Sequence, residues 1–238
     1  MHRRSITLTI AIVVFLTGGT GTTLALLLRH EPAFYTRAAL PEGAPRSKCS
    51  GVFVGELARL FAGISDKRQW DARFTEEQIN SYCQEDFLKE HPDDRPLPER
   101  VSEPRVALEP DRFRVGFRYG TGLWSTVVSI DLRVWLVAKE PNMVAFEFQG
   151  MHAGALPISS QSLLESASET ARRHDIDSTW YRHNGHPVLL LRFQAGRSRP
   201  TFQLRQLDLH PGMLYIGGRS LDTTPQANLG SGPHNLAE

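Results

Sequence analysis

Hydrophobic residues dominate the start of the chain and then recur with two different periods. Residues 6–28 form an apolar run in which every polar side chain is a threonine. A helix rises about 1.5 Å per residue, so about 20 such residues cross the hydrocarbon core of a bilayer. The run therefore predicts a transmembrane helix that anchors the rest of the chain.

The charges that flank this run predict its orientation. Arg3 and Arg4 precede it and a single Arg29 follows it. The positive-inside rule then places the N-terminus in the cytoplasm, with a single span in the inner (cytoplasmic) membrane and an extracytoplasmic remainder. A cleaved signal peptide stays open as the alternative. Against it, the run exceeds the usual apolar core of about 7–15 residues, and residues 26–29 offer no small-x-small cleavage site.

Helical spacing of apolar residues follows the anchor. Residues 50–64 repeat large hydrophobic side chains on one face and predict a helix, and residues 69–74 predict a short strand. Thr75 and Gln78 have the spacing of a capping box, which predicts that a helix begins there. A third helix is expected over residues 160–174.

From Pro104 onward the period changes to two, which is typical of strands. Residues 113–119, 127–137 and 144–148 are expected to form an antiparallel meander. Asn184-Gly185 predicts a hairpin turn between residues 178–183 and 186–193. His210-Pro211-Gly212 predicts another turn, between residues 201–209 and 213–219.

These elements predict an α+β protein with an N-terminal transmembrane helix, followed by a curved antiparallel sheet packed on about three helices. Residues 1–30 are assigned to a cytoplasmic stub and the anchor, and residues 31–47 to a juxtamembrane linker rich in Pro and Gly over residues 40–46. Residues 48–220 form the extracytoplasmic domain. Residues 221–238 are expected to be disordered, because they offer little apolar surface to bury.

Charge and cysteine content restrict the function classes. The chain has 27 Lys and Arg against 26 Asp and Glu, a net charge of +1, which argues against nucleic acid as a partner. Cys49 and Cys83 are too few for a disulfide scaffold or a structural zinc site. In an oxidising compartment they form either one disulfide or two buried thiols, and both alternatives stay open.

No catalytic, metal or cofactor site is predicted. His183 and His186 bracket the Asn184-Gly185 turn and could share a metal with His174 or Asp175, but no further ligand has signature spacing, so a solvated hairpin tip is favoured. The serines at positions 159, 160 and 162 lack a nucleophile-elbow motif and are interpreted as helix caps. The Gly-x-Gly at 120–122 precedes a strand, whereas phosphate binding needs a helix there.

The alternating strand 112–119 carries arginines on one face. Arg112, Arg114 and Arg118 are interpreted as a solvated face, with contact to anionic lipid headgroups as the alternative. On the opposite face lie Phe113, Val115 and Phe117.

Several features together suggest a family. The N-terminal span, the phrase Phe74-Thr75-Glu76-Glu77-Gln78-Ile79-Asn80 at a helix start, the long amphipathic strands and Leu156-Pro157-Ile158-Ser159 resemble the YpmS-like family of small single-span bacterial membrane proteins of unknown function. That resemblance covers residues 1–220. It implies a likeness to the tubular lipid-binding fold, in which a curved sheet wraps a helix and leaves an apolar groove, and it implies no catalytic residues.

The expected function is therefore that of a membrane-anchored, non-catalytic domain of the cell envelope that binds lipid or another apolar ligand in a groove of the sheet. The alternative is a structural or partner-binding envelope module with a closed core and no ligand. Expected partners are bilayer lipid, and a lipid ligand or an envelope protein. The groove is expected to be lined by Phe113, Val115, Phe117, Val128, Ile130, Leu132 and Phe146.

Overall fold

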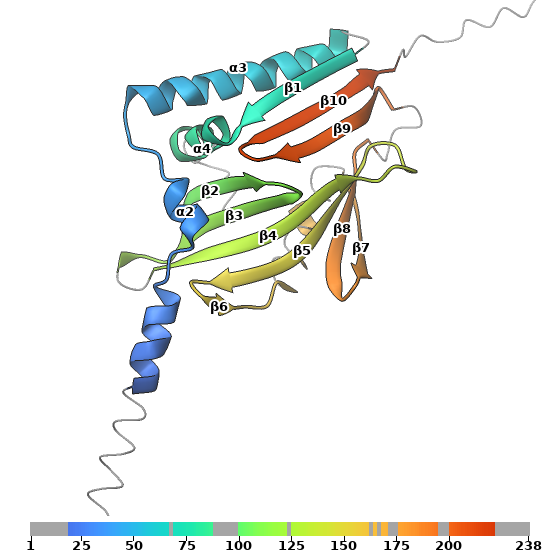
Figure 1. Cartoon of the computed structure of the whole chain (residues 1–238). Coiled ribbons are helices and arrows are strands. Elements are labelled where there is room, and N and C mark those ends of the chain that lie inside the picture. Colours follow the sequence, from blue (N-terminus) through green and yellow to red (C-terminus); the bar gives the residue numbers. More distant parts are fainter. Residues whose placement is uncertain are drawn as a thin grey trace, which may run out of the picture.

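The computed structural model describes residues 19–66, 69–87, 100–122, 125–161, 164–165, 168–170, 176–194 and 200–221 (Figure 1). Two antiparallel sheets and a few helices make up this part of the chain, which confirms the predicted α+β class. A helix over residues 19–28 leads into α2 (Ala33–Arg37), α3 (Ala44–Asp66) and α4 (Glu76–Glu85). The described residues between 161 and 170 are also helical.

The larger sheet has seven strands in the order β2-β3-β4-β5-β8-β7, with β6 paired to β5. The predicted meander is confirmed, and so is the hairpin at Asn184-Gly185, where His183 pairs with His186. The first strand of the sheet, β2, was not predicted. The bounds are β2 (Val101–Glu109), β3 (Arg112–Tyr119), β4 (Thr126–Leu136), β5 (Met143–Ala153), β6 (Leu156–Pro157), β7 (Asp177–His183) and β8 (His186–Arg192).

The smaller sheet has the order β1-β10-β9, with β1 (Gln69–Thr75), β9 (Phe202–His210) and β10 (Met213–Ser220). Its hairpin turns at the predicted residues 210–212. β1 pairs with β10 along its whole length, although the two strands lie far apart in the sequence. The chain thus forms two sheets where a single curved sheet was expected, and Figure 1 shows the smaller sheet above the larger one.

The helices agree with their sequence signals, with one correction. The Thr75 backbone N–H donates to Gln78 Oε1 over 2.8 Å, and the Gln78 backbone N–H donates to Thr75 Oγ1 over 3.2 Å, which confirms the capping box. The interpretation of residues 40–46 as linker is wrong from Ala44, where α3 begins. Pro45 did not exclude a helix because its fixed φ and missing N–H are tolerated in a first turn.

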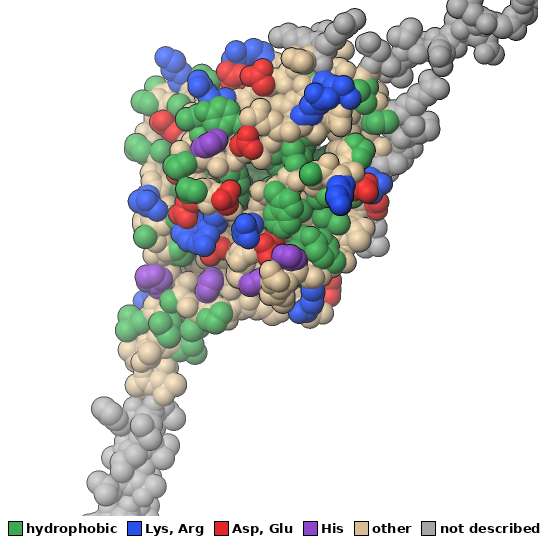
Figure 2. All heavy atoms as spheres, turned by 45° about the vertical axis from the view of Figure 1, so that its right-hand side comes forward, with side chains coloured by type: hydrophobic (Ala, Val, Ile, Leu, Met, Phe, Trp, Pro, Cys, Tyr) green, Lys and Arg blue, Asp and Glu red, His purple; other side chains and the backbone are tan. Residues whose placement is uncertain are grey.

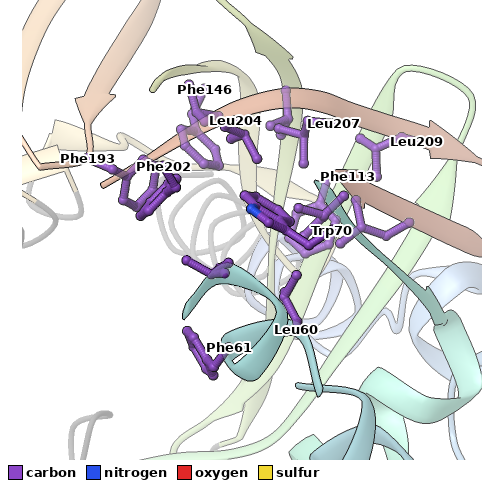
Figure 3. Close-up of a pocket in the computed structure, with 15 residues that line it drawn as sticks. Leu60, Phe61, Trp70, Phe113, Phe146, Phe193, Phe202, Leu204, Leu207 and Leu209 are labelled. Carbon is purple, nitrogen blue, oxygen red and sulfur yellow. The ribbon is translucent and has the colours of Figure 1, made fainter. Parts of the chain in front are cut away.

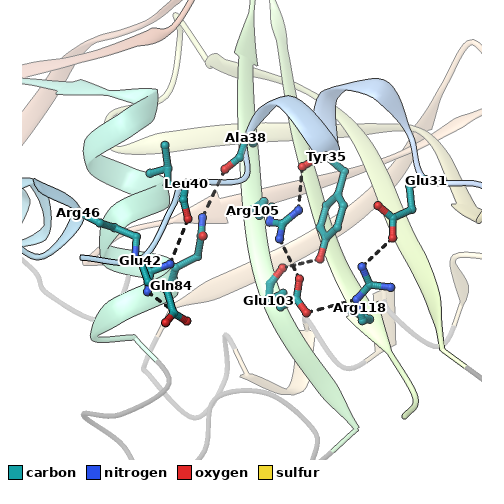
Figure 4. Close-up of polar contacts among 10 residues, drawn as sticks. All are labelled: Glu31, Tyr35, Ala38, Leu40, Glu42, Arg46, Gln84, Glu103, Arg105 and Arg118. Carbon is teal, nitrogen blue, oxygen red and sulfur yellow. Dashed lines mark hydrogen bonds and ion pairs between the residues drawn. The ribbon is translucent and has the colours of Figure 1, made fainter. Parts of the chain in front are cut away.

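The segment 31–46 packs against the domain (Figure 4). The side chain of Tyr35 in α2 is fully buried, its hydroxyl donates to the backbone carbonyl of Glu103 over 2.9 Å, and the Arg105 guanidinium lies 4.1 Å from its ring centroid. Farther along, Arg46 pairs with Glu85 at 2.6 Å. The described segment 31–46 is therefore held by specific contacts to β2 and α4.

The interpretation of the β3 arginines as a solvated face is wrong for two of the three. Arg118 is paired with Glu31 at 2.7 Å and with Glu103 at 3.3 Å, and its pKa is raised, chiefly by the hydrogen bond to Glu31. Arg114 is paired with Asp131 at 3.0 Å and its guanidinium faces the Phe34 ring. Between them Gly116, which has no side chain, leaves the space that α2 occupies. Arg112 is exposed.

The described part of the predicted anchor begins at residue 19. No helix among the described residues is both long and apolar enough to cross a membrane. Leu24, Leu26 and Leu27 are exposed, and Figure 2 shows hydrophobic side chains gathered on this helix where it leaves the body. Four parts of the chain with predictions lie outside the described residues: residues 6–18, the proline-rich stretch 91–99, residues 162–163, 166–167 and 171–174 of the expected third helix, and the tail from residue 222.

Candidate functional site: an apolar cavity between the sheets

A cavity of about 380 Å³ lies between the two sheets and the C-terminal half of α3 (Figure 3). Every side chain that lines it is hydrophobic. β9 and β10 form its longest wall, the larger sheet forms the opposite wall, and α3 and β1 close one side. The lining comprises Leu60, Phe61 and Ile64 of α3, Trp70 of β1, Phe113 of β3, Val134 of β4, Val144 and Phe146 of β5, Phe193, and Phe202, Leu204, Leu207, Leu209, Leu214 and Ile216 of the β9–β10 hairpin.

A bulge in β9 gives this wall its unusual spacing. Leu207 pairs with Ile216 and Leu204 pairs with Gly218, and the register shifts between Gly217 and Gly218. The extra residue on β9 lets side chains three positions apart face the same side, where a regular strand places only every second residue. The bulge therefore keeps both ends of β9 turned toward the cavity.

Polar contacts join the two sheets near both ends of the β9–β10 hairpin. At one end, buried Asn142 donates from Nδ2 to the Phe202 carbonyl over 2.8 Å and accepts at Oδ1 from the Leu204 N–H over 2.8 Å. At the other end, the Gly212 N–H donates to the Leu108 carbonyl over 2.9 Å. The separation of the sheets is thus fixed at these points by hydrogen bonds, and the hydrophobic side chains between them leave unfilled space.

Phe61 connects the cavity to solvent. Its side chain lines the cavity and is 61% exposed, the second most exposed of the large hydrophobic residues described. Figure 2 shows hydrophobic side chains gathered near the middle of one face of the body, with charged side chains of both signs spread around them. The surface beside Phe61 therefore carries neither a purely positive nor a purely negative charge, as suits the entry of an uncharged apolar molecule.

The structure brings two of the seven predicted groove residues to the cavity, Phe113 and Phe146. Phe117, Ile130 and Leu132 do not line it. They pack in a cluster with Phe148, Leu189 and Leu164, which the cavity residues Phe113 and Phe146 also contact. Val128 is buried and Val115 is half-buried, and neither lines the cavity. Most of the remaining lining came from the hairpin 202–216 and from α3, whose apolar alternation and helical spacing were recognised without their being assigned to the ligand site. Trp70, Val134, Val144 and Phe193 complete it.

The other sequence candidates form no second site among the described residues. No group of three or more His, Cys, Asp or Glu with metal-binding geometry occurs in this part of the chain, and His174 and Asp175 lie outside it. Cys49 and Cys83 are both free thiols. Burial raises the pKa of the Cys83 thiol to about 11.

Comparison with known proteins adds no identification: no protein-family model, curated protein or solved structure matches the chain. The likeness to YpmS-like proteins stays a prediction.

Proposed function

We propose that this chain is a bilayer-anchored, extracytoplasmic domain that holds the hydrocarbon chain of a lipid in the cavity between its sheets, without catalysis. The observation that carries the proposal is the cavity itself. Its volume of about 380 Å³ falls within the range of small-molecule sites, roughly 300–1,000 Å³, and its lining is hydrophobic throughout.

A space of this size is unusual for a packed core. Protein interiors are close-packed, with few voids larger than a water molecule. Because an apolar cavity gains nothing from water, an occupant with hydrocarbon surface is favoured by the hydrophobic effect, at about 25 cal/mol per Å² removed from water. The hydrogen bonds of Asn142 and Gly212 hold the sheets apart and so oppose collapse of the space.

The N-terminal part of the chain supports the proposed location. The apolar run 6–28, the arginines before it and the exposed leucines of its last turns are those expected of an anchor with its N-terminus in the cytoplasm. The predicted likeness to YpmS-like proteins points in the same direction. The bilayer would supply the lipid to a domain anchored at its surface.

Mass spectrometry of molecules that copurify with the full-length chain tests the proposal. We expect organic extraction to release lipid at close to one molecule per chain. In Leu207→Trp, where added bulk enters the cavity, the lipid should fall severalfold. Val52→Trp is the matched control, because Val52 lies exposed on α3 and does not line the cavity. Equal lipid in both variants, or none in the wild type, would overturn the proposal.

One observation favours the second candidate, an envelope module with a closed core. Five of the seven residues expected in the groove do not line the cavity, and three of these pack in the cluster around Phe148. If the purified chain is empty and Leu207→Trp raises its free energy of unfolding by filling the void, the closed-core module is the better account.

A further inference from the structure

A short hydrophobic segment lies exposed beside the end of the N-terminal helix. The sequence of residues 155–158 is Ala-Leu-Pro-Ile, and three of these four residues, Ala155, Pro157 and Ile158, are exposed to solvent. The Ile158 side chain is 39% exposed. Single exposed hydrophobic residues are normal on a protein surface, whereas a contiguous group of them indicates an interaction site.

Hydrogen bonds place this segment at the C-terminal end of the helix. The Ala155 N–H donates to the Leu27 carbonyl over 2.8 Å, and Thr126 Oγ1 donates to the Leu28 carbonyl over 2.6 Å. Tyr119, which is 43% exposed, pairs with Thr126 across β3 and β4. Figure 1 shows β6, the centre of the segment, on the side of the body from which the helix leaves. The segment 155–158 and Tyr119 therefore lie near the same helix end.

The end of the apolar run sets the level of the membrane surface. As a helix, residues 6–28 would measure about 35 Å, against about 30 Å for the hydrocarbon core of a bilayer. An anchor of this length ends among the lipid headgroups. Because Ala155 is hydrogen-bonded to the last turn of the run, the segment 155–158 begins at that level.

The backbone of the segment suits the boundary between headgroups and hydrocarbon. Backbone N–H groups that enter apolar surroundings need acceptors within the protein. The Ala155 N–H has the Leu27 carbonyl as its acceptor. The Ile158 N–H donates to the Met151 carbonyl over 2.9 Å, and Pro157 has no N–H. These three residues can therefore leave water without exposing an unpaired backbone donor to the lipid.

The side chains around the helix end are also compatible with a membrane surface. Residues 119–122, 125–126 and 154–160 include no Asp or Glu, so none of their side chains repels lipid phosphates. Tyr119 adds an aromatic ring with a polar hydroxyl, and such side chains are enriched at the boundary between membrane and water. Charge and side-chain type thus agree with the level that the helix end sets.

We propose that residues 155–158 and Tyr119 form a second membrane contact, which enters the headgroup layer of the bilayer that holds the N-terminal helix. The inference rests on the anchor in the proposed function and adds an interaction surface on the domain itself. Its partner is the phospholipid surface, because the segment is continuous with the helix end. The contact holds the larger sheet against the membrane, so that the domain lies on the bilayer.

Depth-dependent fluorescence quenching tests the contact in the full-length chain, reconstituted into phosphatidylcholine vesicles. Ile158→Trp places a fluorescent ring at an exposed position of the segment. We expect its added fluorescence, measured against the wild-type chain, to be quenched severalfold more by bromine near the headgroup end of the acyl chains than by bromine near the methyl end. Tyr119→Trp, which keeps an aromatic ring, gives an independent probe with the same expected order.

Val52→Trp is the matched control for both variants. Val52 is 40% exposed, as Ile158 is 39% exposed, but it lies on α3, which Figure 1 shows on the side of the body opposite the N-terminal helix. Its added fluorescence should not respond to bromine in the lipid. Iodide in the aqueous phase should give the reverse order, quenching Val52→Trp and sparing Ile158→Trp.

The outcomes separate this inference from the proposed function. If the chain floats with the vesicles in a density gradient but Ile158→Trp and Tyr119→Trp respond no more than Val52→Trp, or respond more to bromine near the methyl end, the inference fails while the anchor stands. If the chain does not float with the vesicles, the anchor fails and the inference fails with it. Lipid in the cavity is measured separately by extraction, and neither result depends on it.

Discussion

The backbone carbonyl of Leu27 accepts a hydrogen bond of 2.8 Å from the backbone N–H of Ala155, which joins the N-terminal helix to the turn between β5 and β6. The next carbonyl, that of Leu28, accepts from Thr126 Oγ1 over 2.6 Å. The last carbonyls of a helix have no partners within the helix. Here the larger sheet and the turn after β5 supply them, so the described part of the predicted anchor is fixed in direction relative to the two sheets.

Substitution of Gly154 tests the attachment of the N-terminal helix to the larger sheet. A Cβ at Gly154 would lie 2.2 Å from the Leu27 carbonyl oxygen, too close for any side chain. Gly154→Ala should therefore detach the helix and speed tryptic cleavage after Arg29 severalfold. Gly122→Ala is the matched control, because Gly122 has a similar φ of +56° against +60° but open space around it. Equal cleavage rates in the two variants would show that backbone strain, and not the contact, is responsible.

Gly116 tests the packing of α2 on β3. A Cβ there would lie 2.7 Å from Tyr35 Cδ2, and Tyr35 is fully buried. Overpacking of this kind typically costs about 1–3 kcal/mol. Urea unfolding of Gly116→Ala should show a loss in that range. Gly55→Ala, at an open position within α3, should be neutral or slightly stabilising; a loss of similar size there would contradict the packing argument.

Substitution of Asn142 tests the hydrogen bonds that connect the two sheets. The φ of Asn142 is +56°, so Asn142→Gly relaxes the backbone while removing both side-chain hydrogen bonds to β9. Loss of these buried contacts should lower the free energy of unfolding by about 2 kcal/mol. Asn184→Gly changes a residue with a similar φ of +50° at an exposed hairpin tip, and should cost almost nothing. Thermal or urea unfolding of both variants measures the difference.

The raised pKa of the Cys83 thiol predicts that the free energy of unfolding falls at alkaline pH. Burial raises its pKa from 9.0 to about 11, so above pH 9 the unfolded chain releases the thiol proton while the folded chain keeps it. The stabilisation is complete below pH 9 and is lost as the pH rises to 11, by roughly 2–3 kcal/mol. Cys83→Ala should flatten this part of the curve, leaving the contribution of Tyr35, whose pKa burial raises to about 12. Identical slopes in both proteins would contradict the assignment.

The local pattern predicted most individual elements, because those signals are local. Alternation placed β3, β4 and β5, and the Asn184-Gly185 turn placed the β7–β8 hairpin. β2 was missed because Val106, Ala107 and Leu108 are buried in succession and so show no alternation. Glu103, with a φ of +50°, lies where the β2–β3 register shifts, which also disturbs the period.

The site could be predicted only in part because it depends on which strands pair. Phe113 and Phe146 were found from the apolar face of the meander. The residues of the opposite wall could not be predicted without two facts about pairing. β1 pairs with β10, and the hairpin 202–220 belongs to a separate sheet that faces the meander. Pairing between strands so distant in sequence leaves no periodic signal. The shielding of Arg114 and Arg118 likewise depended on α2 docking over Gly116.

Photo-crosslinking tests the central claim most directly. An acyl ester with a diazirine at its chain end, added to the full-length chain and irradiated, should label peptides of α3 and of the β9–β10 hairpin, around Phe61, Leu207 and Ile216. Excess unlabelled ester should compete for these positions. Labelling confined to residues 6–28, or spread without competition over the surface, would contradict a lipid site between the two sheets.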